Sequence, residues 1–341
     1  MPRPTHSKKK KSADLVESAS QRPSVPVDEQ QELKKQAARL RRLETLYEEP
    51  IAVLPEDASS HQFDAERVHR AVRVGTTIHM PFWKDGTVGI PNCMLRSPLW
   101  SAKTIPLANA QLNEDAPLPV LFDTNYDDIR IEARGALMGA YDRRVFAACL
   151  NLFRDQPIFL DGKPTELAVT FYRLVGRLGA GYSPETQQSV AASLSRLSKT
   201  SVTVWAKGVE YQVPFLLGAT WPSDAPITGS VTVTLSLAPS IANLFSRAAW
   251  TAVPQEALDA GKGLKSWLSC FYATHSRPYP VSLKRLYSLS GYTGLIGDFR
   301  VKLWKALSAL GEGADTSVIN VRKFVEKEGT FEVHLSRWQA M

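Results

Sequence analysis

Two stretches of the chain place hydrogen-bonding and cationic side chains on the outer face of a predicted helix. The first stretch contributes Gln188, Ser195, Arg196 and Lys199. The second contributes Arg300, Lys305 and Ser308. Amide, hydroxyl and guanidinium groups hydrogen-bond the edges of bases, and cations pair with phosphates. These residue types therefore predict two DNA-binding surfaces and no catalytic centre.

The first surface belongs to a predicted unit of three helices and a hairpin. Apolar residues recur at helical spacing in the stretches 146–153, 171–178 and 190–197. Ser183 and Pro184 supply an N-cap and a first-turn proline for the third helix. Residues 202–215 then alternate between apolar and polar about a turn at Lys207, which is a hairpin pattern. We expect Lys207 to contact a phosphate.

A second predicted unit repeats this order near the C-terminus. Its helices are expected in the stretches 264–271, 281–289 and 299–310. Its hairpin pairs Ser317–Val325 with Thr330–Leu335 and carries Arg322 and Lys323, both expected to pair with phosphates. Two close helices followed by a basic hairpin form a winged helix-turn-helix. The second of these two helices, which is the third helix of each predicted unit, enters a DNA groove. The sequence thus predicts an α+β fold with two tandem winged helix-turn-helix domains.

Composition separates a basic arm from the two expected domains. Residues 1–60 are polar and charged, with a run of lysines at 8–11, and predict a largely disordered arm with one short helix. The first winged-helix domain, with additional N-terminal strands, is expected at 61–218. The second is expected at 219–341.

Four short motifs lie in order between Leu95 and Trp338. They are Arg96-Ser97-Pro98-Leu99-Trp100, Thr170-Phe171-Tyr172-Arg173-Leu174, Ser193-Leu194-Ser195-Arg196-Leu197, and Phe271-Tyr272 followed by Ser276-Arg277-Pro278-Tyr279-Pro280 and Leu283. Together they resemble the TrfA-type plasmid replication initiators. The resemblance implies a protein that binds direct repeats (iterons) in origin DNA, helps to open an AT-rich region and recruits the host helicase. It also implies a cytoplasmic, plasmid-associated bacterial protein that is monomeric on DNA and can form a homodimer.

The resemblance also raises the question of a sliding-clamp contact. The family carries a Gln-Leu-x-Leu-Phe-type peptide in its N-terminal region, and the corresponding stretch here is 43–47. Leu46 and Tyr47 suit a hydrophobic pocket. However, Leu43 stands where the family has Gln, and Glu44 replaces the first Leu. The stretch is a candidate clamp-binding site, but these departures favour a plain helix end.

Composition is compatible with a DNA-binding protein. The 341 residues include 41 Lys and Arg against 34 Asp and Glu, a formal net charge of +7. Such an excess favours polyanionic partners, although charge alone leaves open a merely basic soluble protein. The three cysteines, Cys93, Cys149 and Cys270, lack metal-ligand spacing and are expected to be reduced. No stretch of the sequence is as long and apolar as a membrane span.

Catalytic motifs are missing, so we expect no enzymatic activity, no cofactor and no metal. The glycines around Lys262 lack the spacing of a phosphate-binding loop, and the histidines are scattered. His275, just after a predicted helix, is expected to cap that helix or to contact the DNA backbone. Three functional classes remain: an iteron-binding initiator, a winged-helix repressor of its own promoter that does not melt DNA, and a DNA-nicking enzyme for which no nucleophile is found.

Two apolar residues, Val301 and Trp304, fall on the outer face of the last predicted helix. Large apolar side chains are unusual on a solvated helix face. They are expected either to contact thymine methyl groups or to pack against another element.

Overall fold

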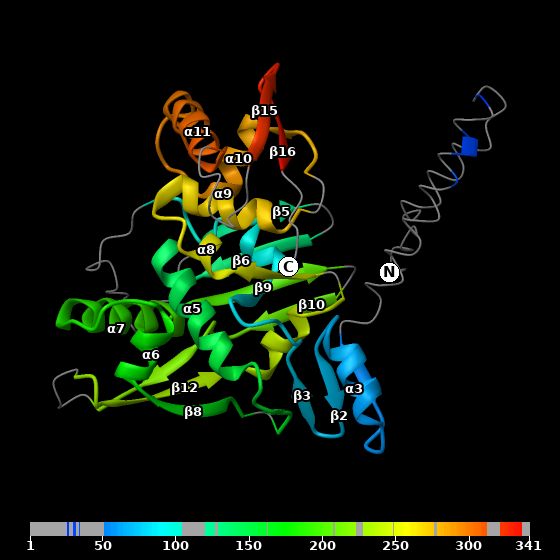
Figure 1. Ribbon diagram of the computed structural model, residues 1–341, viewed down its shortest axis with the longest axis vertical. Helices are drawn as coiled ribbons and strands as arrows, with labels where there is room; N and C mark the ends of the chain where they lie inside the picture. The colour runs from blue at the N-terminus through cyan, green and yellow to red at the C-terminus, as the bar shows by residue number, and fades with distance from the viewer. Residues whose placement is uncertain are drawn as a thin grey trace, which may run out of the picture. The chain divides into compact units, whose positions relative to one another are not determined.

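The computed structural model divides the chain into two compact parts, Met1–Glu49 and Pro50–Met341. The residues it describes are 26, 30, 31, 34, 51–103, 120–126, 129–161, 163–206, 209–222, 228–247, 249–275, 278–311 and 321–335. Most of the expected arm, the clamp candidates Leu43, Leu46 and Tyr47, and Lys207 lie outside the described residues. The second part has a mixed α and β fold (Figure 1).

Residues 51–60, which were expected to be disordered, belong to the folded part. Strand β1 (Ala52–Leu54) pairs in parallel with β2 (Val72–Val74), and helix α3 (Ser60–Arg67) connects them. Ser59 begins α3 with a capping box, in which its side chain and that of Gln62 each accept a hydrogen bond from the other's backbone N–H. The sheet continues through β3 (Thr77–His79) to β7 (Ile158–Phe159).

The first unit consists of three helices and three strands. They are α5 (Ala140–Phe153), β8 (Thr165–Thr170), α6 (Phe171–Arg177), α7 (Pro184–Ser198), β11 (Gly218–Thr220) and β12 (Thr232–Leu237). The sheet order is β11-β12-β8, so the strand that precedes α6 pairs with the last strand of the unit. The Ser183 side chain caps α7, as the sequence predicts, and the Thr170 side chain caps α6.

The hairpin predicted at 202–215 exists, but its place in the fold differs from the expectation. Strands β9 (Ser201–Ala206) and β10 (Val209–Val213) pair with each other, and β9 then joins β6 (Ile129–Arg134) and β5 (Val120–Tyr126) in a separate sheet. The hairpin packed with β8 is β11–β12. Alternation reveals strands but not their distant partners, so the sequence pattern assigned the wrong hairpin to this position.

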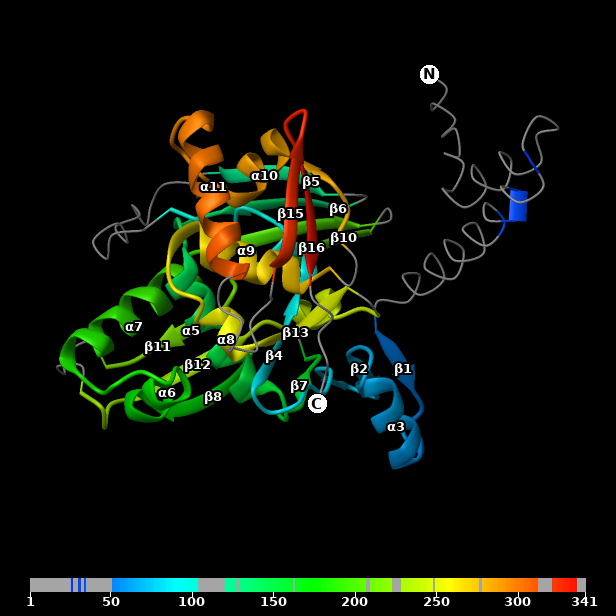
Figure 2. The same cartoon turned by 45° about the horizontal axis from the view of Figure 1, so that its top comes forward.

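The second unit repeats the order of the six elements of the first unit, without the strands of other sheets (β7, β9 and β10) that are inserted in the first unit. Its elements are α9 (Gly263–Ala273), β14 (Val281–Ser282), α10 (Leu283–Ser290), α11 (Ile296–Gly311), β15 (Val321–Lys327) and β16 (Thr330–Leu335). The sheet order β14-β16-β15 again pairs the strand before the second helix with the last strand. The helix expected from 281 begins at 283, because Val281 and Ser282 first pair with β16. Figure 2 shows α11 beside the β15–β16 hairpin.

Two hydrophobic cores lie behind these units. The larger core contains Phe146 of α5 and also side chains that follow the expected boundary at 218, including Leu235, Val253 and Leu258. These come from β12, from β13 (Trp250–Pro254), which pairs with β4 (Thr87–Pro91), and from α8 (Gln255–Leu258). The smaller core begins at Leu264, apart from Ala102. Apart from Cys270, which packs in the larger core, the buried side chains change core between 258 and 264. The boundary of independently folding domains at 218 stays a prediction.

The motif at 96–100 joins the two cores. It follows the short helix α4 (Asn92–Leu95). The Trp100 ring packs against Phe146 of α5, with 5.5 Å between ring centroids. The Arg96 guanidinium donates to the Thr274 hydroxyl and carbonyl at 2.7 and 2.6 Å. Just beyond the motif, the Ala102 N–H donates to the Ser290 carbonyl of α10 at 2.8 Å. This segment therefore fixes α10 of the second unit against the first core.

Candidate nucleic-acid interface

Helix α11 has one buried side and one exposed side. Phe299, Leu303 and Leu307 are fully buried in the smaller core, which fixes the helix orientation. The opposite side exposes large and cationic side chains from the first three turns. They are Arg300, Val301, Lys302, Trp304 and Lys305, with Ser308 half-buried beyond them. The expected outer face is therefore present.

Glu326 of β15 ties this face to the hairpin. Its largely buried carboxylate accepts hydrogen bonds from Trp304 Nε1 at 2.9 Å and from Arg300 Nε at 3.1 Å. The Trp304 ring also packs edge-to-face on Phe324, with 4.6 Å between centroids. Packing against another element, one of the two expectations for Trp304, thus accounts for this side chain. The pairing with Glu326 also offsets part of the Arg300 charge.

Two lysines supply the remaining positive charge on α11. Lys302 donates to the Tyr292 hydroxyl at 2.7 Å, and this hydrogen bond raises the Lys302 pKa. Lys305 is exposed and forms no ion pair with any residue that the structure describes. Sequence reasoning missed Lys302, although a helical wheel places it between the exposed and buried sides of α11.

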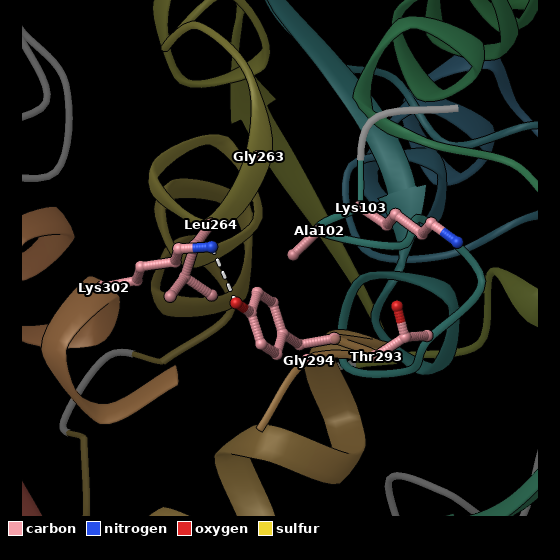
Figure 3. Close-up of a pocket in the computed structure, with 8 residues that line it drawn as sticks. Ala102, Lys103, Gly263, Leu264, Thr293, Gly294 and Lys302 are labelled. Carbon is pink, nitrogen blue, oxygen red and sulfur yellow. Dashed lines mark hydrogen bonds between the residues drawn. The ribbon is translucent and has the colours of Figure 1, made fainter. Parts of the chain in front are cut away.

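A pocket of about 430 Å³ lies beside Lys302, between the start of α9 and the turn before α11 (Figure 3). Its lining residues are Ala102, Lys103, Gly263, Leu264, Tyr292, Thr293, Gly294 and Lys302. The hydrogen bond from Lys302 to Tyr292 joins two of these lining residues. A second lysine, Lys103, therefore lines the same pocket as Lys302.

The hairpin of the second unit exposes both cations expected there. Arg322 and Lys323 are exposed on β15, at a register shift in its pairing with β16. Lys323 lies opposite His334, and the next pair along the ladder is Phe324 with Val333. Successive residues of a strand face opposite sides of the sheet, so Lys323 faces away from the side on which Phe324 packs against Trp304.

In the first unit, α7 presents a face with little charge. Gln188 is exposed, and Ser195 and Lys199 lie half-buried seven and eleven residues later on the same side. Cationic side chains occur instead on α6, where Arg173 and Arg177 are exposed one turn apart. Arg173 belongs to the motif at 170–174, whereas Arg177 lies beyond it. Both arginines could have been found from the polar side of the predicted helix at 171–178.

Arg196 is the exception among the expected contact residues, because it is buried with only 3% of its surface exposed. Its Nε and Nη2 donate to Asp142 Oδ1 at 2.9 and 2.7 Å, and Ser193 Oγ donates to the same oxygen at 2.7 Å. Asp142 Oδ2 accepts from the Gly139 N–H at 2.8 Å and so caps α5. The expected exposure of Arg196 is therefore wrong. The residue instead links α7 to the start of α5.

His275 is also buried, so of its two expected roles the contact with the DNA backbone is contradicted and the capping of the preceding helix, α9, is supported. Its ring packs on Phe271 with 4.7 Å between centroids, and Nδ1 lies 2.9 Å from the Phe271 carbonyl oxygen. Burial, together with the nearby Arg96 charge, lowers the His275 pKa to about 4. The imidazole is therefore neutral at physiological pH and belongs to the junction between the cores.

The cysteines and acidic groups form no further site among the described residues. Cys93, Cys149 and Cys270 are free thiols, and burial raises their pKa values. No group of three His, Cys, Asp or Glu side chains within the described segments could hold a metal ion. No helix among those segments is long and apolar enough to span a membrane.

No known protein family and no curated protein matches the chain. Two solved structures, both of domains 2 and 3 of RctB, are distantly similar. One, from a selenomethionine derivative, has a TM-score of 0.40 and 17% identity, covering 63% of this chain and 90% of the other. The second, RctB-155-483, has a TM-score of 0.41 and 15% identity, covering 64% of this chain and 91% of the other. Both TM-scores are too low to assign a fold or function to this chain.

Proposed function

We propose that this protein is a plasmid replication initiator that binds direct repeats in origin DNA through two winged helix-turn-helix domains. One observation carries the proposal. Two groups of three helices and three strands follow the order helix, strand, helix, helix, strand, strand, each with its first strand paired to its last; in the first group, strands of other sheets (β7, β9 and β10) are inserted between these elements. This topology suits a DNA-binding unit in which the third helix enters the major groove and the hairpin contacts the backbone.

The second unit is proposed to supply the stronger DNA contact. Its third helix exposes Lys302 and Lys305, and its hairpin exposes Arg322 and Lys323. Cations on both elements would pair with phosphates on either side of the groove that holds α11. The first unit would use Gln188 for a base edge, because Gln can hydrogen-bond adenine with both its donor and its acceptor. Its phosphate contacts would come from α6.

The motif resemblance supports initiation over simple repression. The segment 96–100 joins the two cores, and the motifs at 170–174 and 193–197 lie in α6 and α7. These motifs therefore lie in the elements that would position two units on neighbouring DNA segments. By the same resemblance, we propose that the host helicase and sliding clamp are partners, that the protein is monomeric on DNA, and that it performs no catalysis itself.

An origin-opening experiment tests the proposal. The full-length protein is added to supercoiled plasmid carrying its own origin, and permanganate then detects unpaired thymines. We expect protection of a repeat array and new reactivity in the adjacent AT-rich tract, because bending and untwisting are absorbed most cheaply in flexible steps. Host initiation factors are included in a parallel reaction, and a plasmid without the repeats is the control.

Two results would overturn the proposal in different ways. Protection of the repeats without any permanganate reactivity, even with host factors present, would identify a repressor. Cleavage of the supercoiled plasmid by the pure protein with magnesium would identify a nicking enzyme. Reactivity confined to the tract beside the repeats, without strand cleavage, is the result that supports initiation.

A further inference from the structure

We propose that apolar side chains at the exposed start of α11 contact the C5-methyl groups of thymines in the major groove. The side chains are Leu295, Ile296 and Val301. This inference rests on the proposed function, because it assumes that α11 enters a groove. Beyond the proposed function, it states which base edge α11 prefers. No motif in the chain specifies that preference.

The exposure of these three residues is the first observation. Leu295, Ile296 and Val301 are 76%, 46% and 55% exposed, whereas Phe299 and Leu303 on the same helix are fully buried. Leu295 and Ile296 lie at the helix start, where the Leu295 carbonyl accepts from the Phe299 N–H. Leu295 and Ile296 are adjacent in the chain, and Val301 lies more than one turn further along α11. The start of a third helix is also the part that contacts base edges in this class of DNA-binding unit.

Charge around this apolar surface indicates its occupant. Lys302 follows Val301, and Lys305 lies one turn further along the exposed side. Flanking cations favour a polyanion over an apolar protein groove, because two phosphate strands border the apolar floor of a major groove. Among the four bases, thymine alone presents a methyl group there.

Trp304 differs from these residues, although it is also exposed in part. Its indole nitrogen is held by Glu326 and its ring packs against Phe324. Trp304 therefore joins α11 to the hairpin and holds the helix in one orientation. Val301, one turn earlier, is 55% exposed. Val301 is therefore available for methyl contacts together with Leu295 and Ile296, whereas Trp304 positions the helix.

Replacing thymine by deoxyuridine tests this directly, since it removes the methyl group and keeps base pairing. The probe is a duplex that the full chain enriches from a random-sequence pool. It is remade with deoxyuridine at each thymine in turn. We expect wild-type binding to weaken about 3- to 5-fold at one or two positions, the loss expected for one buried methyl group. In Val301→Ala, at least one of these substitutions should have no further effect.

A matched valine provides the control. Val53 on β1 is 69% exposed and lies outside both units, so Val53→Ala should keep the wild-type response to deoxyuridine. Wild-type binding that is insensitive to every deoxyuridine would overturn this inference and leave the proposed function standing. An unchanged deoxyuridine response in Val301→Ala, or DNA binding unaffected by that substitution, would also overturn it and favour a protein partner. Failure to enrich any duplex would instead contradict DNA binding itself.

Discussion

Burial divides the polar residues that sequence patterns assign to DNA. Arg196 and His275 are buried and hold elements together, whereas Lys305 is exposed with no ion-pair partner among the described residues. Arg300 stands between these groups, since it is exposed but paired with Glu326. A cationic residue type on a helix is therefore insufficient to identify a contact. A cationic side chain that is already paired with a carboxylate or carbonyl of the protein is less available to a phosphate than one that is exposed and unpaired.

The buried His275 predicts an acid-sensitive stability. Its folded-state pKa is about 4, below the ordinary value of 6.5, so the unfolded chain binds a proton first as the pH falls. The contribution of the neutral His275 to the free energy of unfolding is complete above pH 6.5. It is lost between pH 6.5 and 4, which lowers that free energy by on the order of 3 kcal/mol. Denaturant unfolding at pH 7 and pH 4.5 measures it. His275→Asn keeps a donor near the Phe271 carbonyl but does not titrate, so it should lose less stability over this range. Equal losses in both proteins would contradict the assignment.

At the scale of elements, a buried ion pair holds the third helix of the first unit. Removing one partner of such a pair leaves an uncompensated charge and costs about 3–5 kcal/mol. We therefore expect Arg196→Ala to lower the free energy of unfolding by this amount, measured in urea. Arg173→Ala, on the exposed side of α6, should change it by less than about 0.5 kcal/mol. Similar stabilities for the two variants would show that the Asp142–Arg196 pair does not hold α7.

The six helices of the two units could largely be predicted from the sequence. Apolar spacing of three and four residues is local, and so are the caps at Thr170 and Ser183. The outer face of α11 follows from the same spacing. Local patterns could not show that Asp142 lies beside Arg196, 54 residues away. They also could not show that β8 pairs with β12, because strand pairing across long separations leaves no periodic trace.

At the scale of the whole molecule, contacts between the cores limit how the two units move relative to each other. Buried Arg143 of α5 donates to the Ser266 hydroxyl and carbonyl of α9 at 2.7 and 3.0 Å. Arg144 of α5 pairs at 2.6 Å with Asp259, which caps α8 within the larger core just before the second unit begins. These contacts add to those of the 96–100 segment. We therefore infer that the two proposed DNA-binding units approach DNA as one body. The phosphates contacted by the two units should then add up in the binding of the full chain.

The central claim is that the two units bind DNA together, and the salt dependence of DNA binding tests it most directly. Two units together should neutralise on the order of 6–10 phosphates, so affinity of the full chain for the enriched duplex should fall about 10³- to 10⁵-fold from 50 to 200 mM salt. Lys305→Ala should reduce the slope of log affinity against log salt by about one, whereas Lys84→Ala, at an exposed turn before β4, should leave it unchanged. A nearly flat response of the wild-type chain would contradict DNA binding by these two units.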